Sequence, residues 1–196
     1  MQADKFLQTA REQVAESARV KEAFLSDEKA MQTIAEVAAL LVKAYKAGNK
    51  SLWAGNGGSA ADAQHMAAEL VNKFCLDRDG LPAVALTVDT SVLTAIGNDY
   101  GYDKVFARQI VAQGREGDVF VGISTSGNSA NLVQALDACR EKGVVSVALV
   151  GGKACEMDAY DYVIHVPSTQ TPRIQECQTL VGHILCYIVE QSMFGL

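Results

Sequence analysis

The chain has 196 residues, 49% of them hydrophobic, and its 17 Lys and Arg against 23 Asp and Glu give a formal net charge of −6. This length and composition can bury one substantial core, so we predict a single domain over residues 1–196. The acidic balance, without any long basic run, excludes nucleic acid as the main partner.

The segment before residue 50 has a helical pattern. Apolar side chains recur every three or four positions along residues 31–45, and a Gly-Asn pair closes the run. This spacing predicts two successive N-terminal helices, over about residues 3–25 and 28–46.

Beyond residue 50, short apolar runs alternate with segments of helical spacing. Five runs rich in Val, Ala and Leu are candidate strands, at residues 51–55, 83–88, 118–124, 144–150 and 162–166. Such strands alternating with helices indicate a parallel sheet covered by helices on both faces. A last helix is predicted over about residues 172–194, and ligands of such folds bind beyond the carboxyl ends of the strands.

Two of these strands run into loops of small residues that precede helices. The loops are Gly-Asn-Gly-Gly-Ser at 55–59 and Ser-Thr-Ser-Gly-Asn-Ser at 124–129. Unpaired N–H groups at a helix N-terminus, together with glycines and hydroxyls, can hold a phosphate. The alternative is a tight connection, with Ser59 and Asn128 or Ser129 as N-caps. Three hydroxyls in the second loop favour phosphate binding there.

The helix after the first loop carries His65 and Glu69, which are four residues apart and therefore share one face. Its apolar side is formed by Met66, Ala67, Leu70, Val71 and Phe74. The polar pair can bind a metal ion, exchange protons with a substrate, or lie solvated on the surface. Taken alone, the pair is typical of a solvated surface.

His183 lies in the most apolar stretch of the chain, on the last predicted helix. A single histidine there is typical of a core residue with satisfied hydrogen bonds. Gln175 and Thr179 extend a polar stripe toward it, however. Polar groups on an apolar helix need partners, so a core role and a functional role both stay open.

The chain shows no sign of export or membrane insertion. Residues 1–5 mix both charges without a following apolar run, unlike a signal peptide. The apolar stretch over residues 180–189 is shorter than the ~20 residues of a membrane span. Five scattered cysteines without a Cys-x-x-Cys pair fit reduced thiols packed in a core. We therefore expect a cytoplasmic protein.

Five motifs follow one another in a fixed order. They are Gly-Asn-Gly-Gly-Ser (55–59), Gln-His-Met-Ala-Ala-Glu-Leu (64–70), Ala-Ile-Gly-Asn-Asp-Tyr-Gly (95–101), Gly-Ile-Ser-Thr-Ser-Gly-Asn-Ser (122–129) and Arg-Ile-Gln-Glu (173–176), with His183 after them. Together they resemble the phosphoheptose isomerases of the sugar isomerase (SIS) domain superfamily, over nearly the whole chain. The resemblance implies a three-layer α/β/α fold with a five-stranded parallel sheet, preceded by two N-terminal helices. It also implies a homotetramer with active sites between subunits.

The resemblance further implies roles for individual residues. The family's phosphate contacts match Ser124, Thr125, Ser126 and Ser129. Its other substrate contacts match Asn56, Gly57, Gly58, Glu69, Asn98, Asp99 and Gln175. Its catalytic acid/base pair matches Glu69 and His183, and the ligands of its zinc ion match His65, Glu69, Gln175 and His183.

The implied reaction converts sedoheptulose 7-phosphate to D-glycero-D-manno-heptose 7-phosphate for bacterial surface polysaccharide such as lipopolysaccharide. An aldose–ketose isomerisation needs a base for a carbon-bound proton and an acid for the carbonyl oxygen, with an enediol between. Glu69 as base and His183 as acid fit these roles. One zinc ion per site would polarise the carbonyl, although it would also occupy carboxylate lone pairs that the base uses.

The spacing of Gln175 and His183 bears on how one site is assembled. Eight residues rise about 12 Å along a helix, so both side chains reach one metal ion only when nearly extended. Because the family's active sites lie between subunits, we expect Glu69 and His183 of one working site to come from different chains.

Two alternative functions share parts of this pattern. A noncatalytic SIS protein that associates with a replication initiator resembles the chain in its glycine and serine loops, but it lacks Glu and His at the acid/base positions. Another SIS sugar-phosphate isomerase or a sugar-phosphate sensor is the second alternative. The presence of both Glu69 and His183 favours the phosphoheptose isomerase.

Overall fold

The computed structural model describes residues 2–195 and is built around one parallel sheet. The five strands lie in the order β2-β1-β3-β4-β5. Their bounds are β1 (Ser51–Gly55), β2 (Ala83–Ala85), β3 (Val119–Ile123), β4 (Val145–Val150) and β5 (Tyr162–His165). Every neighbouring pair is parallel. The predicted α/β class and five-stranded parallel sheet are confirmed.

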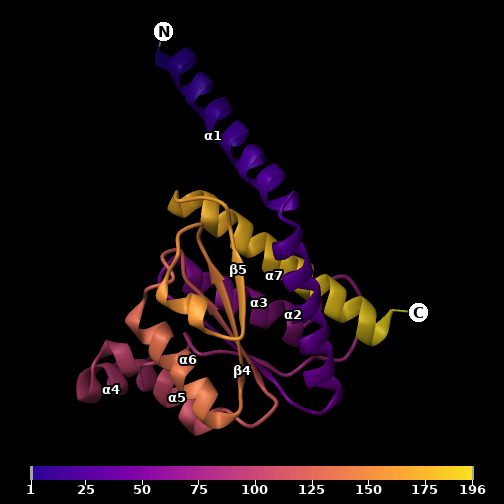
Figure 1. Ribbon diagram of the computed structural model, residues 1–196, viewed down its shortest axis with the longest axis vertical. Coiled ribbons are helices and arrows are strands. Elements are labelled where there is room, and N and C mark those ends of the chain that lie inside the picture. Colours follow the sequence, from indigo (N-terminus) through magenta and orange to yellow (C-terminus); the bar gives the residue numbers. More distant parts are fainter. Residues whose placement is uncertain (1, 196) are drawn as a thin grey trace.

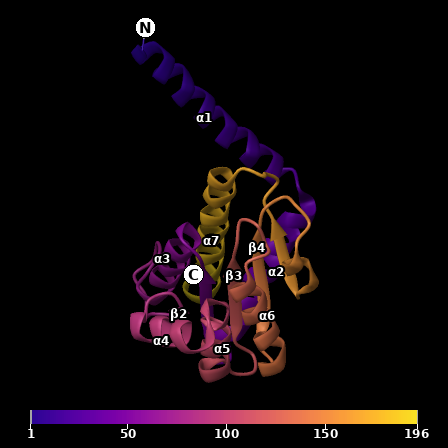
Figure 2. The same ribbon diagram turned by 90° about the vertical axis from the view of Figure 1, so that its left-hand side faces the viewer.

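Helices cover both faces of this sheet, as Figures 1 and 2 show. Their bounds are α1 (Gln2–Leu25), α2 (Glu28–Lys46), α3 (Gly58–Val71), α4 (Thr90–Tyr100), α5 (Ala107–Gln113), α6 (Ala130–Lys142) and α7 (Thr171–Phe194), with short 3-10 turns η1 (Tyr102–Lys104) and η2 (Glu156–Ala159). Helices α2, α3 and α7 pack on one face, and α5 and α6 pack on the other. None of the described helices combines the length and apolar character that a membrane span needs.

Strand residues alternate between two separate cores. Trp53, Val121 and Leu149 face the core under α2, α3 and α7, whereas Leu52 and Phe120 face the core under α5 and α6. Strands buried on both faces appear in the sequence as continuous apolar runs, because neither side can be polar. This is why strands β1, β3 and β4 were predicted within a residue of their observed bounds.

The second strand is shorter than predicted, since it was expected over 83–88 and ends at Ala85. It lies at the edge of the sheet and pairs with β1 at only three positions. The chain then turns to enter α4, where the Asp89 carboxylate accepts a hydrogen bond from the Val92 N–H (2.9 Å) as an N-cap. Residues 86–88 therefore belong to the turn.

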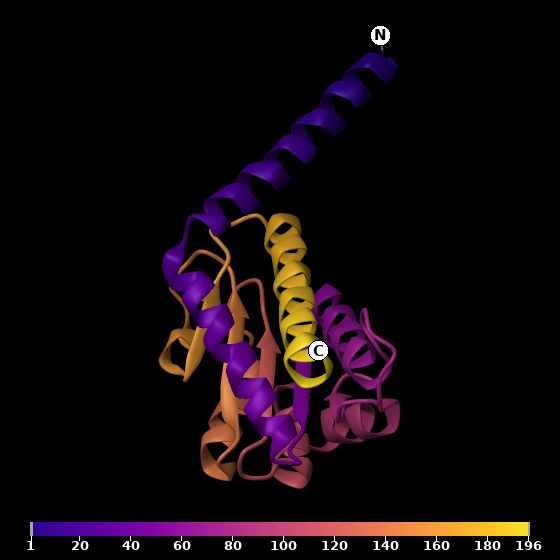
Figure 3. The ribbon, with the colours of Figure 1, turned by 90° about the vertical axis from the view of Figure 1, so that its right-hand side faces the viewer.

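The two N-terminal helices begin and end within one residue of their predicted bounds. Helix α1 projects away from the rest of the protein, as Figures 1 and 3 show from two sides. Only Val20 and Phe24 are buried among its described residues. Its outer part exposes the apolar side chains of Phe6, Leu7 and Val14.

The cysteines follow the core prediction only in part. Cys139, Cys177 and Cys186 are buried, but Cys155 is half-buried and Cys75 is exposed. All five are free thiols. The expectation of five core cysteines is therefore wrong for two positions, which lie in the irregular segments after α3 and β4.

Strand order reverses at β1, which has β2 on one side and β3 on the other. Gly55, at the end of β1, pairs in register with Ile123, at the end of β3. The two small-residue loops therefore leave the same edge of the sheet side by side. In open parallel sheets, ligands bind at such a reversal, beyond the carboxyl ends of the strands.

Candidate active site

The loop after β3 gathers three serine hydroxyls around one point. Ser124 Oγ lies 3.1 Å from Ser129 Oγ and 3.4 Å from Ser126 Oγ. The same oxygen accepts a hydrogen bond from the Gly127 N–H (3.0 Å). Ser129 is the N-cap residue of α6, yet its hydroxyl makes no cap hydrogen bond. Hydroxyls directed together beside the free N–H groups of a helix N-terminus are suited to an anion such as phosphate.

A cavity of about 320 Å³ opens beside this loop. Thr125 and Ser126 line it on the side of β3, and Ser168 and Thr171 line it at the start of α7. Lys153 contributes a positive charge to the lining. The cavity therefore offers both hydroxyl donors and a cation to a small polar ligand.

The loop after β1 lies against the phosphate-type loop. Asn56 and Asn131 exchange two amide hydrogen bonds of 2.9 Å each. Gly57 has φ of +56°, a conformation that favours glycine, and it leads directly into α3 at Gly58. Ser59 therefore lies inside α3 and does not cap it. A Cβ on Gly58 would lie 2.5 Å from the Nε2 atom of Gln175, so a side chain at this position would displace this amide.

Three side chains with metal-binding atoms meet between α3 and α7. His65 Nε2 lies 3.0 Å from Glu69 Oε1 and 3.4 Å from His183 Nε2. One ligand atom from each residue lies within 4.8 Å of the others. A tetrahedral ion with bonds of about 2.0–2.1 Å needs ligand atoms about 3.3 Å apart. The spacings of His65 to Glu69 and to His183 fit a divalent metal ion with one open position.

Helices α3 and α7 of one chain pack in parallel on the same face of the sheet. This packing brings the three residues together. Thr179 donates a hydrogen bond to Asp62 (2.8 Å), and one turn further along both helices His183 meets His65. The meeting of Glu69 and His183 within one chain favours a site whose acid and base come from the same chain, whereas the expectation placed them on different chains. Sequence spacing within each helix gave no information about how the two helices pair.

Three other residues predicted at the site, Gln175, Asn98 and Asp99, make their contacts away from the cluster of two histidines and a glutamate. Gln175 lies eight residues before His183, a rise of about 12 Å along α7, and its amide rests against Gly58. On α4, Asn98 donates a hydrogen bond to Asp99 (2.7 Å). Within residues 2–195, no hydrogen bond joins Asn98 or Asp99 to the histidines. Three of the four predicted metal ligands thus lie together in one chain.

Two neighbouring polar residues were not predicted. Asp62 lies three residues before His65 and therefore on a nearby face of α3. Burial raises the pKa of its carboxyl, against the opposing effects of the Thr179 hydrogen bond and the two nearby histidines. Gln178 is buried and donates to the Ser124 carbonyl (3.2 Å), while its Oε1 has no hydrogen-bond partner. A polar residue on an otherwise apolar helix was the available signal for Gln178.

Gly182 lies where α7 packs against the Met66 side chain of α3. A Cβ at this position would lie 2.3 Å from the Met66 Sδ atom, so the two helices touch here. His183 is the next residue, and this close approach allows it to reach His65. The role of Gly182 depends on a contact between distant segments, which the sequence pattern does not reveal.

We expect Gly182→Ala to push α7 away from α3 and to separate His183 from His65. Overpacking of this kind costs about 1–3 kcal/mol of stability. Zinc affinity, measured by competition with a chromophoric chelator, should fall about 10-fold or more. Gly97→Ala is the control, because a Cβ there has no atom within 4 Å. Unchanged zinc affinity in a folded Gly182→Ala protein would show that the helix spacing does not determine the metal site.

Comparisons of sequence and of structure with known proteins point to the same family. Residues 14–151 match the family model described as SIS domain. The chain is 57% identical to phosphoheptose isomerase 2 of Campylobacter jejuni, over 92% of this chain and 90% of that protein. It is 56% identical to phosphoheptose isomerase of Aneurinibacillus thermoaerophilus, over 91% of this chain and 90% of that protein. The solved phosphoheptose isomerase of Neisseria gonorrhoeae superposes with a TM-score of 0.89 at 42% identity, covering 95% of this chain and 99% of that one.

Proposed function

Because the chain belongs to the phosphoheptose isomerases of the SIS domain family, we propose that it is the isomerase that converts sedoheptulose 7-phosphate to D-glycero-D-manno-heptose 7-phosphate. The product would supply heptose for bacterial surface polysaccharide, including lipopolysaccharide. The observation that carries the proposal is the meeting of Glu69 and His183 between α3 and α7. The noncatalytic alternative is not favoured, because both acid/base residues are present and adjacent.

The proposed mechanism uses Glu69 as base and His183 as acid. Glu69 takes the proton from C1 of the ketose while His183 gives a proton to the C2 carbonyl oxygen, forming the enediol. Protonation of C2 and loss of the O1 proton then give the aldose. Both side chains lie beside His65 Nε2, at 3.0 and 3.4 Å, so one substrate end can contact both.

We propose that His65, Glu69 and His183 hold one zinc ion per active site. The donor set of two imidazole nitrogens and one carboxylate with an open position is typical of catalytic zinc. When bound, the ion would act as a Lewis acid on the substrate carbonyl. Gln175 lies against Gly58 in its own chain, which supports its role as a substrate contact. Its role as a fourth ligand requires the side chains of Gln175 and His183 to be nearly extended along α7.

The proposed phosphate site lies at the other end of the same stretch of α7. Gln178 binds the Ser124 carbonyl, and His183 follows five residues later, a rise of about 7.5 Å along the helix. A seven-carbon sugar with a phosphate at one end and a carbonyl at the other can bridge such a separation. The proposed phosphate contacts are Ser124, Thr125, Ser126 and Ser129, and the proposed sugar contacts are Asn56, Gly57, Gly58, Asn98 and Asp99.

The proposed assembly is a homotetramer in the cytoplasm. Exposed apolar residues Phe6, Leu7 and Val14 on the projecting α1 support contact with another copy of the chain. Arg173 holds the middle of this helix by donating to the Gln13 carbonyl (2.6 Å). The free state of all five cysteines supports a reducing compartment.

A direct assay tests the proposed reaction. Purified protein is incubated with sedoheptulose 7-phosphate, and the aldoheptose phosphate is measured by chromatography with mass detection. Conversion of another ketose phosphate but not this one would instead support a different SIS isomerase. Binding without any conversion would support a sugar-phosphate sensor.

We expect the double substitution Ser124→Ala with Ser126→Ala to raise KM and to leave kcat nearly unchanged. Phosphate binding is similar in the ground state and the transition state, so its loss affects KM. Two lost hydrogen bonds to a charged group, at about 1.5 kcal/mol or more each, predict an increase in KM of about 100-fold or more. Ser26→Ala, at the exposed end of α1, is the matched control. An unchanged KM in the double variant would place the phosphate elsewhere.

A further inference from the structure

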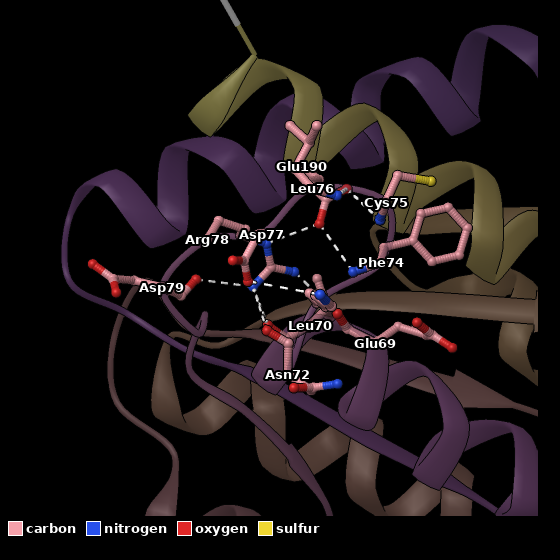
Figure 4. Close-up of polar contacts among 11 residues, drawn as sticks. Glu69, Leu70, Asn72, Phe74, Cys75, Leu76, Asp77, Arg78, Asp79 and Glu190 are labelled. Atoms are coloured by element: carbon pink, nitrogen blue, oxygen red, sulfur yellow. Dashed lines mark hydrogen bonds and ion pairs between the residues drawn. The ribbon is translucent and has the colours of Figure 1, made fainter.

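A buried carboxylate on α7 holds the loop that follows α3. Glu190 is 0% exposed and accepts hydrogen bonds from the backbone N–H groups of Phe74 (2.9 Å), Cys75 (2.7 Å) and Leu76 (2.9 Å). It also accepts one from Arg78 Nε (3.0 Å), and Figure 4 shows these contacts converging on it. Burial by itself raises the pKa of Glu190, but these four donors outweigh burial and hold the pKa below its ordinary value. The carboxylate is therefore ionised and fully partnered.

The Arg78 guanidinium connects this carboxylate to the end of α3. Its Nη2 atom donates to the Glu69 carbonyl (3.0 Å). Its Nη1 atom donates to the Leu70 and Asp79 carbonyls (2.8 and 2.9 Å). The last carbonyls of a helix have no partner within the helix, so Arg78 caps the final turn of α3. That turn carries Glu69. A lysine lacks the planar fork that reaches all these carbonyls at once.

The ion pair of Glu190 and Arg78, together with the loop N–H groups that Glu190 holds, forms a clamp. This clamp also reaches the histidine of the proposed acid/base pair. The Phe74 ring lies with its centroid 5.5 Å from that of His183, tilted by 31°. Its backbone N–H is one of the groups that Glu190 holds. Glu190 follows His183 by seven residues, two helical turns, so both lie on one side of α7. One face of α7 therefore carries both the histidine and the carboxylate that fixes the ring against it.

We propose that Glu190 and Arg78 are positioning residues for the acid/base pair, fixing Glu69 through the last turn of α3 and His183 through Phe74. This inference rests on the proposed isomerase function. The alternative is that the ion pair only closes the loop over residues 72–79. Buried ion pairs are often no more stabilising than apolar side chains of similar volume, because desolvation offsets their attraction. The contacts of this pair favour positioning, because they end at the backbone carbonyl of Glu69 and, through Phe74, at the ring of His183.

The test compares Arg78→Lys, Glu190→Gln and the double substitution Arg78→Met with Glu190→Gln. The double variant leaves no unpaired buried charge and keeps an amide oxygen for the loop N–H groups, so it is expected to fold even if a single variant does not. We expect kcat with sedoheptulose 7-phosphate to fall about 10-fold to 100-fold, as for supporting residues of other sites, while KM changes little. The double variant should regain thermal stability without regaining kcat.

Asp118→Asn is the matched control. Asp118 is also a buried carboxylate, and it accepts hydrogen bonds from the N–H groups of Lys50 (3.0 Å) and Arg115 (2.9 Å). It lies just before β3, at the amino-terminal ends of the strands, whereas the two loops lie at their carboxyl ends. This variant should lose thermal stability and keep the parental kcat.

A second measurement requires no turnover. The imidazole resonances of His183, assigned by comparison with His183→Gln, report its position beneath the Phe74 ring. We expect these resonances to shift in the Glu190 and double variants and to stay unchanged in Asp118→Asn. If the parent protein does not convert sedoheptulose 7-phosphate, the proposed function fails while the resonances still test the clamp. A folded double variant with the parental kcat, or with the parental His183 resonances, overturns the positioning role.

Discussion

Replacing Glu69 by Gln is expected to slow isomerisation by at least ~100-fold, which is the lower range for a positioned acid or base. The amide has nearly the same shape as the carboxylate and can still reach His65 Nε2, which lies 3.0 Å from Glu69 Oε1 in the parent. It cannot accept the carbon-bound proton. Sugar-phosphate binding should change little, since the proposed phosphate contacts lie on the loop after β3. The measurements are kcat by product chromatography and affinity by calorimetry with a nonreacting sugar phosphate.

The control for this substitution is Glu36→Gln on α2. Glu36 also has a partner four residues away, because Gln32 donates to its carboxylate (3.0 Å), and the pair is exposed. Loss of metal is a separate consequence of Glu69→Gln, so kcat is compared at saturating zinc. A rate restored to the parental value by excess zinc would assign Glu69 to the metal alone, and near-normal turnover without added zinc would remove it from the mechanism.

Strong local patterns made most of the fold predictable. The first two helices and strands β1, β3 and β4 follow from apolar spacing and from continuous buried runs. The second strand was predicted too long because the apolar run over residues 83–88 continues into a turn. Strand β2 lies at the edge of the sheet and pairs only with β1, so this pairing sets where β2 ends. The helix after the first loop was also predicted too long, since it was expected to include Phe74 and ends at Val71. Contacts with distant Glu190, which binds the Phe74 N–H, hold the chain after Val71 outside the helix.

The site was predictable where its geometry is local. His65 and Glu69 meet because residues four apart share a helix face. The position of His183 depends on how α7 packs against α3, where Gly182 leaves space for the Met66 side chain. No periodicity within one helix contains this information. The sequence was therefore enough to predict which types of residue the site contains. It was not enough to predict that α7 packs beside α3, because this packing depends on the whole fold.

Mixing Glu69→Gln chains with His183→Ala chains is expected to restore no activity. Both residues lie in one chain, with their ligand atoms within 4.8 Å of each other, so in every hybrid each site has lost one of the two. The variants carry different tags, are coexpressed or mixed for subunit exchange, and hybrids are identified by native mass spectrometry. Product formation is then compared with that of each parent variant.

The positive control for that experiment is a mixture of the unsubstituted chain with chains that carry both Glu69→Gln and His183→Ala. Its hybrids should keep activity in proportion to the unsubstituted chains they contain, because each such chain brings a complete pair of acid and base. This shows that exchange itself does not inactivate the assembly. Activity that returns in hybrids of the two single variants would mean that α3 of one subunit faces α7 of another in the working enzyme. Continued inactivity in demonstrated hybrids, beside an active positive control, assigns Glu69 and His183 of each site to a single chain.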